Sequence, residues 1–129
     1  MGPVPGADDG AKETFEAVGR FNEAFNRHDV DGVMRSMTDD CVFENTCPPP
    51  DGERYIGQEA VRGFWERFFR SSPDAVFETE EIFAHGDRCV ARWLYRWVGK
   101  DGMPGHIRGV DVFRVRDGKV AEKLSYVKG

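Results

Sequence analysis

A single carboxylate stands among apolar neighbours in the C-terminal third of the chain. In the run 106–115, alternation along a strand puts Asp111 on the same face as Ile107, Gly109 and Phe113. A lone carboxylate on an apolar face is costly to bury unless it is paired or does chemistry. When ionised, such a group can act as a base toward an acidic C–H. When neutral, it can donate a hydrogen bond to a carbonyl or an enolate.

Two cations are candidates to pair with this acid. If residues 116–118 form a three-residue hairpin loop, Asp111 lies opposite Lys123, and Ser125 shares its face. Arg92, on the preceding strand, is the second cation. Burial favours the neutral form of a carboxyl and a cation within about 4–6 Å favours the ionised form, so the two cations together favour an ionised Asp111. A structural ion pair, or an exposed Asp on an uncovered sheet face, is the non-functional alternative.

Hydrophobic periodicity predicts the elements that position these residues. Apolar residues recur at helical spacing in 12–27 and 58–70, and a short helix between them carries Val33, Met34 and Met37. Residues 41–45 predict a short strand, and the Pro- and Gly-containing stretch 46–53 predicts a loop. The later strand-like runs, separated by turn residues, are 75–84, 88–98, 106–115 and 119–127.

This order of elements is typical of an α+β fold, in which helices cover one face of an antiparallel sheet. We expect a single domain over residues 12–129. Residues 1–11, which are rich in Gly, Pro and Asp, predict a flexible N-terminal arm. A chain of 129 residues with 40% hydrophobic residues can fill one core and also line a cavity.

Composition argues against several classes of function. The net charge of −5 and the absence of a Lys/Arg cluster argue against a nucleic-acid partner. No apolar run approaches the roughly 18 residues of a membrane span, and the N-terminus has no signal-peptide pattern. The three cysteines follow no metal-ligand spacing. We therefore expect free thiols in a cytoplasmic protein, with no membrane partner, no bound metal and no cofactor.

Four segments carry a resemblance to a known family. They read Phe21-Asn-Glu-Ala-Phe-Asn-Arg-His-Asp-Val-Asp-Gly, Asp39-Asp-Cys-Val-Phe-Glu-Asn, Gly57-Gln-Glu-Ala-Val-Arg-Gly-Phe-Trp and Gly109-Val-Asp-Val-Phe-Arg-Val-Arg-Asp-Gly-Lys-Val-Ala-Glu. Their order and spacing resemble ketosteroid isomerases and SnoaL-like polyketide cyclases of the nuclear transport factor 2-like superfamily, over residues 12–127. The resemblance implies a cystatin-like cone, in which a curved antiparallel sheet wraps around N-terminal helices and leaves an apolar pocket.

The resemblance to ketosteroid isomerases can be checked at the positions that do their chemistry. Their general base corresponds to Asn45, which cannot accept a proton as a base. Their hydroxyl donor corresponds to Phe21. Their oxyanion-hole acid corresponds to Asp111, and the same position is the acid/base residue of SnoaL-like cyclases. Steroid isomerisation therefore lacks its central base in this chain.

A second relative can be checked in the same way. In limonene epoxide hydrolase-like proteins, the Arg of an Asp-Arg-Asp arrangement corresponds to Arg92. The two acids of that arrangement correspond to Leu94 and Ser125, so this chemistry lacks its acids. The His of a C-terminal motif in many SnoaL-like proteins corresponds to Lys123.

The resemblance also implies which face of the run 88–98 points into the cone. It puts Arg92 and Leu94 inside, and leaves Trp93, Tyr95 and Trp97 as an aromatic stripe on the outer face. An exposed stripe of this size needs covering, so we expect a homodimer through it. Alternation alone permits the opposite orientation, in which the aromatic residues line the pocket.

The predicted site lies in this pocket and binds a small hydrophobic or aromatic molecule. The expected catalytic residues are Asp111, Arg92, Lys123 and Asn45, and the expected substrate-binding residues are Phe21, Trp65, Leu94, Phe113 and Ser125. The function that we expect is cofactor-free proton transfer on a hydrophobic carbonyl compound, as in an isomerase, cyclase or lyase. The alternatives are a binding protein, in which Arg92 and Lys123 hold a polar ligand head, and a dimeric scaffold with a structural Asp111–Lys123 pair.

Overall fold

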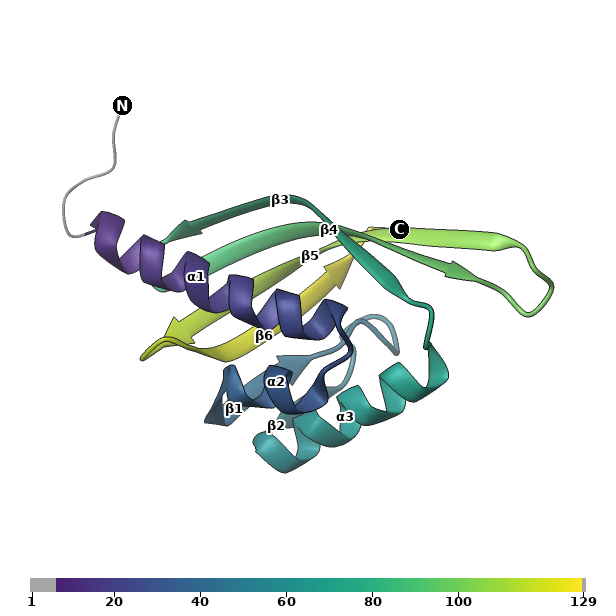
Figure 1. The fold of residues 1–129 in the computed structure, drawn as a ribbon, viewed down its shortest axis with the longest axis horizontal. Coiled ribbons are helices and arrows are strands. Elements are labelled where there is room, and N and C mark those ends of the chain that lie inside the picture. The colour runs from purple at the N-terminus through teal and green to yellow at the C-terminus, as the bar shows by residue number, and fades with distance from the viewer. Residues whose placement is uncertain (1–6, 129) are drawn as a thin grey trace.

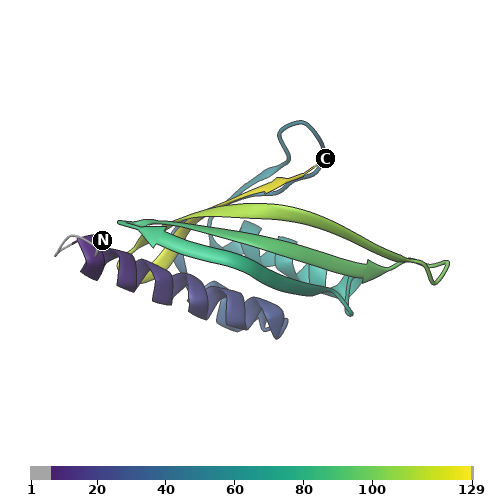
Figure 2. The ribbon, with the colours of Figure 1, turned by 90° about the horizontal axis from the view of Figure 1, so that it is seen from above.

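Three helices lie against one curved six-stranded sheet in the computed structural model, which describes residues 7–128 (Figure 1). The helices are α1 (Ala7–Asn26), α2 (Val30–Arg35) and α3 (Gln58–Ser71). The strands are β1 (Met37–Glu44), β2 (Arg54–Ile56), β3 (Val76–His85), β4 (Arg88–Val98), β5 (Pro104–Arg116) and β6 (Lys119–Val127). The hairpin end of β4 and β5 extends beyond the helices in both ribbon views (Figures 1 and 2). The predicted α+β class and the curved sheet are confirmed.

The sheet is mixed, which corrects the prediction of an antiparallel sheet. Its strand order is β2-β1-β6-β5-β4-β3, and every neighbouring pair is antiparallel except β1 and β6, which are parallel. Hairpins set the directions of β3 to β6 one after another, because each turn reverses the chain. No hairpin joins β1 to β6, so the turn signals in the sequence carry no information about this pairing.

The first helix buries the apolar stripe that the sequence predicts. Val18 and Phe21 are fully buried, and Phe25 is 8% exposed. The helix begins at Ala7, within the segment 1–11 that the sequence predicts as an arm. Residues 1–6 of that segment lie outside the described residues.

The second helix is short because Asp29 caps its N-terminus and strand β1 begins soon after its C-terminus. The Asp29 side chain accepts a hydrogen bond from the Gly32 N–H at 3.0 Å, which satisfies one of the free donors of the first turn. The helix ends at Arg35, and Met37 begins β1. Met37 therefore belongs to the sheet, whereas its periodicity with Val33 predicts that it belongs to the helix.

The turn between β5 and β6 is tighter than the three-residue loop that the sequence predicts. Arg116 pairs with Lys119, so the turn contains only Asp117 and Gly118. Both have positive φ, 53° and 74°, as a type I′ hairpin turn requires. If the register set by this turn continued along β6, Lys123 would lie opposite Val112 and would point to the outer face.

A β-bulge between Arg114 and Val115 restores the expected face. It shifts the register by one residue, so that Lys123 pairs with Phe113 and Ser125 pairs with Asp111. A shift of one residue moves every side chain of a strand to the other face. The predicted face of Lys123 and Ser125 is therefore right, although the direct partner of Asp111 is Ser125.

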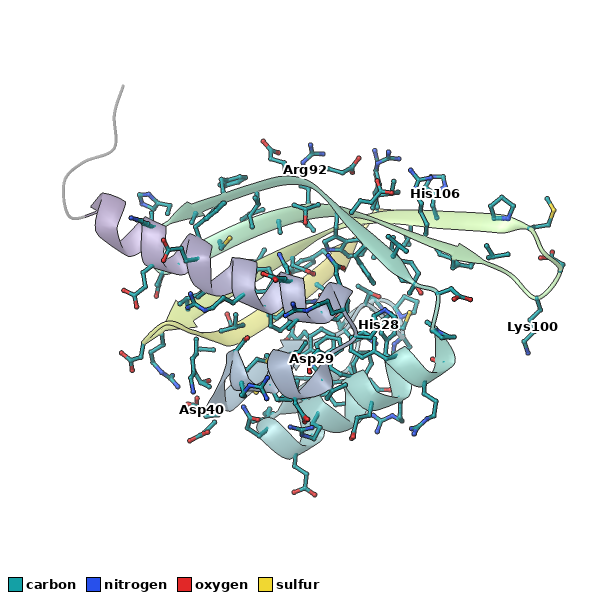
Figure 3. The ribbon with its side chains drawn as sticks, viewed as in Figure 1. His28, Asp29, Asp40, Arg92, Lys100 and His106 are labelled. Atoms are coloured by element: carbon teal, nitrogen blue, oxygen red, sulfur yellow. The ribbon has the colours of Figure 1, made fainter. Side chains whose placement is uncertain are left out.

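The orientation of β4 is opposite to the one that the resemblance implies. Trp93 pairs with Gly109 and Ala91 pairs with Asp111, and directly paired residues share a face of the sheet. Trp93 covers Gly109 so closely that a Cβ there would overlap the indole ring and lie 2.6 Å from the Tyr126 carbonyl oxygen. The even-numbered positions of β4 then lie on the outer face, where Figure 3 shows Arg92 pointing away from the helices.

This packing predicts the effect of filling the space above Gly109. Gly109→Ala should lower the free energy of unfolding by about 1–3 kcal/mol, because the added methyl group forces Trp93 or the neighbouring backbone to move. Urea denaturation measures this loss. Gly19→Ala is the control, since a Cβ there meets nothing within 4 Å, and it should stabilise α1 by about 0.5–1 kcal/mol. Equal stability of Gly109→Ala and wild type would contradict the proximity of Trp93.

Candidate functional site

The concave face of the sheet, together with α1 and α3, encloses a cavity of about 340 Å³. This volume is within the range of small-molecule sites. Its wall is largely aromatic, and the aromatic residues that line it are Phe21, Phe25, Phe43, Phe64, Trp65, Phe68, Phe77, Trp93 and Tyr95. Close ring pairs hold this wall together, with centroid distances of 5.1 Å for Phe25–Trp65 and 4.4 Å for Phe77–Tyr95.

Asp111, Lys123 and Ser125 form a polar group in this wall. The Lys123 Nζ donates to the Ser125 Oγ at 2.9 Å, and the Ser125 hydroxyl donates to the Asp111 Oδ1 at 2.7 Å. The Lys123 Nζ also lies 3.3 Å from the Asp111 Oδ2. The three side chains are therefore joined by a short hydrogen-bonded path and by a direct ion pair.

The ion pair is shielded from water. The side chains of Lys123 and Asp111 are 9% and 10% exposed. The Lys123 Nζ lies 4.8 Å from the Phe43 ring centroid and 5.5 Å from that of Trp65, which is within the range of cation–π attraction. Burial lowers the pKa of Lys123, and the neighbouring Asp111 carboxylate offsets only part of this effect.

Two indole N–H groups add to the donors of the site. Within residues 7–128, neither Trp65 Nε1 nor Trp93 Nε1 has a hydrogen-bond partner, although both atoms are buried. An indole nitrogen can only donate, and an unpaired buried donor is costly. An acceptor oxygen of a ligand that reaches either nitrogen would remove this cost.

The remaining polar residues lie on the segments that border the cavity. Asn45, Thr46 and Cys47 belong to the segment between β1 and β2, Asn22 and Asn26 belong to α1, and Thr79 belongs to β3. The Asn45 N–H donates to the carbonyl oxygen of residue 53 at 2.9 Å, which closes the base of the segment 46–52. These amide and hydroxyl groups can hydrogen-bond a ligand but cannot act as bases.

Most of the predicted site residues lie together around the cavity. Those that line it are Asp111, Lys123, Asn45, Phe21, Trp65 and Ser125. Phe113 is fully buried and packs edge-on against Phe21, with a centroid distance of 5.6 Å. Phe113 thus supports the wall without lining it.

Arg92 and Leu94 do not belong to the site, which corrects the sequence-based prediction. The Arg92 side chain is 55% exposed and its Nε lies 2.9 Å from the Glu81 Oε1 on the outer face. Leu94 lies on the same outer face, where it pairs with Arg108. The cause is the orientation of β4, which places the even-numbered side chains outside.

The predicted dimer interface is wrong for the same reason. Trp93 and Tyr95 line the cavity, so they are not exposed on the outer face. Trp97 belongs to the same stripe and is 39% exposed near the hairpin end of β4, where it covers Gly105. Dimerisation itself stays a prediction, without the interface on which it was based.

Sequence reasoning could have found the aromatic wall of β4. Gly105 and Gly109 are four residues apart on one strand, and Trp93 and Trp97 are four residues apart on its partner. A large ring opposite a glycine is a favourable cross-strand arrangement, because the glycine leaves room for it. Phe43 carries no comparable signal, since its face depends on the pairing of β1 with the distant strand β6. The face of Phe77 depends on a β-bulge between Thr79 and Glu81 in the β3–β4 hairpin, which the turn residues do not indicate.

Residues 7–128 give little support for a metal site or for reactive buried cysteines. No group of three or more His, Cys, Asp or Glu side chains in this range is placed to hold a metal ion. Burial raises the pKa of both Cys41 and Cys89 to about 11, so both are protonated thiols at neutral pH. No helix in the described part of the chain is long and apolar enough to cross a membrane.

Similar solved structures define the class of the fold. A nuclear transport factor 2-like protein of unknown function from Mesorhizobium loti is 37% identical, with a TM-score of 0.80 over 99% of this chain and 98% of that one. TerC, crystallised with polyporic acid, is 18% identical, with a TM-score of 0.77 over 90% and 92%. An LEH-like epoxide hydrolase from M. tuberculosis is 22% identical, with a TM-score of 0.73 over 92% and 84%. The latter two share the fold alone.

The particular family follows from the sequence match. The model of the SnoaL-like domain matches residues 18–123, and the chain belongs to this family. No curated protein matches the chain. The predicted nuclear transport factor 2-like, SnoaL-like family is confirmed.

The shielded ion pair predicts strong coupling between its two partners. Lys123→Met or Asp111→Asn alone should cost about 3–5 kcal/mol of stability, because each leaves the other charge or its donors unpaired in the interior. The double variant should cost clearly less than the sum. Urea denaturation of the four proteins gives the coupling energy.

The exposed pair Arg92–Glu81 provides the matched control for this cycle. Its side chains are 55% and 54% exposed, so its coupling energy should be only about 0.2–1 kcal/mol. Coupling between Lys123 and Asp111 that is no stronger than this value would mean that water reaches the buried pair.

Proposed function

We propose that this protein is a cofactor-free enzyme that transfers a proton on a small hydrophobic or aromatic carbonyl compound. The observation that supports this most strongly is the Asp111–Ser125–Lys123 group, buried in the wall of an aromatic cavity. A cavity that only stores a hydrophobic ligand does not need two buried charges, which are costly to desolvate.

Asp111 is the base in this proposal. Its carboxylate takes a proton from the carbon next to the carbonyl group, and the aromatic wall keeps competing water away. Asn45 holds the position of the base in ketosteroid isomerases and cannot take this role. Within the described lining residues, Asp111 is the only carboxylate, so it also returns the proton when the reaction needs one.

Lys123 stabilises the negative charge that develops on the carbonyl oxygen. An ammonium group has three N–H donors, and the contacts with Ser125 and Asp111 occupy two of them. The third can donate to a substrate oxygen. A donor held in place before the reaction, in a site of low dielectric constant, is an effective way to stabilise an oxyanion.

A binding protein without chemistry is the second candidate. The observation in its favour is that Lys123, Ser125 and Asp111 already satisfy one another, as a purely structural ion pair would. A ligand would then be held by the aromatic wall and by the indole donors of Trp65 and Trp93.

Hydrogen exchange on a simple ketone separates these two functions. We expect the wild-type protein to accelerate deuterium incorporation next to the carbonyl group of 2-tetralone in D₂O, as followed by ¹H NMR. Asp111→Asn should slow this exchange by about 10²–10⁴-fold, the usual contribution of a general base. Asp117→Asn is the matched control, because Asp117 is exposed in a turn and Asn tolerates its positive φ.

The outcomes of this experiment are distinct. Exchange that is as fast in Asp111→Asn as in wild type would reject Asp111 as the base. Binding of 2-tetralone by wild type without any exchange would favour the binding protein. Ser125→Ala keeps both charges and should slow exchange less than Asp111→Asn, so it serves if the Asp111 variant does not fold.

A further inference from the structure

Lys123 differs from every other lysine of the chain in its surroundings. The sequence contains five lysines, all within the described residues, and Lys12, Lys100, Lys119 and Lys128 are exposed. Lys123 is only 7% exposed and lies against two aromatic rings in the cavity wall. Its amine is therefore the one lysine amine that a hydrophobic ligand in the cavity can meet.

The hydrogen bonds around Lys123 form a path for its proton. The ammonium donates to the Ser125 Oγ at 2.9 Å, and the Ser125 hydroxyl donates onward to the Asp111 Oδ1 at 2.7 Å. Both bonds point in the same direction, from the lysine to the acid. A shift of one proton along each bond converts the ammonium–carboxylate pair into a neutral amine and a neutral carboxylic acid, and leaves Ser125 as a hydroxyl.

Burial favours the neutral amine of Lys123 more than water does. A buried charge loses its hydration, and two neutral partners avoid this penalty. The same cause lowers the pKa of Lys123. A neutral amine is a nucleophile, whereas an ammonium is not.

We propose that Lys123 is a covalent binding site for aldehydes and ketones, which it captures as an imine inside the aromatic cavity. This inference uses the same cavity as the proposed function but does not depend on proton transfer at carbon. It assigns to the protein a second kind of chemistry, the formation of a carbon–nitrogen bond.

The reaction balances with groups that are already in the wall. The Lys123 lone pair attacks the carbonyl carbon, and a C–N bond forms while the C=O π bond breaks. The oxygen takes a proton from Asp111, now a carboxylic acid, and the nitrogen loses one to the resulting carboxylate. The Asp111 acid then gives a proton to the carbinolamine hydroxyl, which leaves as water while the nitrogen lone pair forms the C=N bond. The protonated imine returns its N–H proton to the Asp111 carboxylate and becomes a neutral imine. The sum is amine plus carbonyl compound giving imine plus water.

The shape and lining of the cavity select the carbonyl compound. The Phe43 and Trp65 rings lie beside the Lys123 Nζ in the cavity wall, so a flat aromatic aldehyde can pack against aromatic lining with its carbonyl carbon at the amine. A cavity of about 340 Å³ accommodates a two-ring compound of this kind. Small hydrophilic aldehydes gain nothing from this wall and should react with exposed lysines equally well.

Reductive trapping tests this proposal on the intact protein. Wild-type protein is incubated at neutral pH with 2-naphthaldehyde and sodium cyanoborohydride, which reduces an imine to a stable secondary amine. Intact mass and peptide mapping then locate the adduct. We expect one adduct per chain on Lys123, in excess over each exposed lysine by about tenfold or more, because burial lowers the pKa of Lys123 and the aromatic wall holds the aldehyde beside it.

Two variants serve as controls. Lys119→Arg removes an exposed lysine and should leave the labelling of Lys123 unchanged. Lys123→Arg should abolish the cavity adduct, and circular dichroism checks that it is folded. If it does not fold, the peptide map of wild type decides alone, because it compares Lys123 with the four exposed lysines in the same molecule.

The result that would overturn the proposal is an unmodified Lys123, whether the exposed lysines are labelled or not. This outcome is independent of the exchange experiment on 2-tetralone. If Lys123 is labelled but hydrogen exchange does not depend on Asp111, the imine site stands and the proton-transfer function is rejected. If exchange depends on Asp111 but Lys123 is not labelled, only the imine site is rejected.

Discussion

The ammonium of Lys123 and the carboxylate of Asp111 lie behind aromatic rings, each about nine-tenths buried. Among the described residues of the cavity wall, neither has a second opposite charge to pair with. Each charge is tolerable there only because the other is 3.3 Å away and Ser125 bridges them. The strands that carry them must therefore keep one register. A bulge in β5–β6 sets it, since without the bulge Lys123 would face outward.

The rest of the wall is arranged around this pair. The parallel pairing of β1 with β6 sets Phe43 beside Lys123, which gives the ammonium an aromatic neighbour on the far side from Asp111. On the other side of Asp111, β4 contributes Ala91 and then Trp93, whose indole covers Gly109. Small residues next to the acid and large rings farther away leave a cavity in front of the polar group.

Part of this arrangement could be read from the sequence. Asp111 stands out because it interrupts an apolar alternation, and the helices and strands follow from periodicity and turn residues. The face of Lys123 was also predicted, though for an incomplete reason. A three-residue loop without a bulge and a two-residue turn with a bulge put Lys123 on the same face, so the error in the turn does not change the side to which it points.

Other parts could not be read in this way. Alternation assigns two faces to β4 but does not say which is inside, and both a stripe of Trp and Tyr and a stripe of Arg and Leu can be rationalised there. The equal spacing of Gly105 and Gly109 with Trp93 and Trp97 favours the aromatic face inside, and the register in the structure decides it. The parallel pairing of β1 and β6 joins segments that are far apart in the chain, and no local signal encodes it.

A crystal structure of the protein with 2-tetralone bound tests most directly whether the buried polar group is the reactive centre. We predict that the ketone oxygen lies within about 2.7–3.2 Å of the Lys123 Nζ, the range of a hydrogen bond. The carbon next to the carbonyl group should face the Asp111 carboxylate. A ketone that occupies the cavity with its oxygen turned away from Lys123, or a structure in which Lys123 and Asp111 are separated by water, would contradict this account.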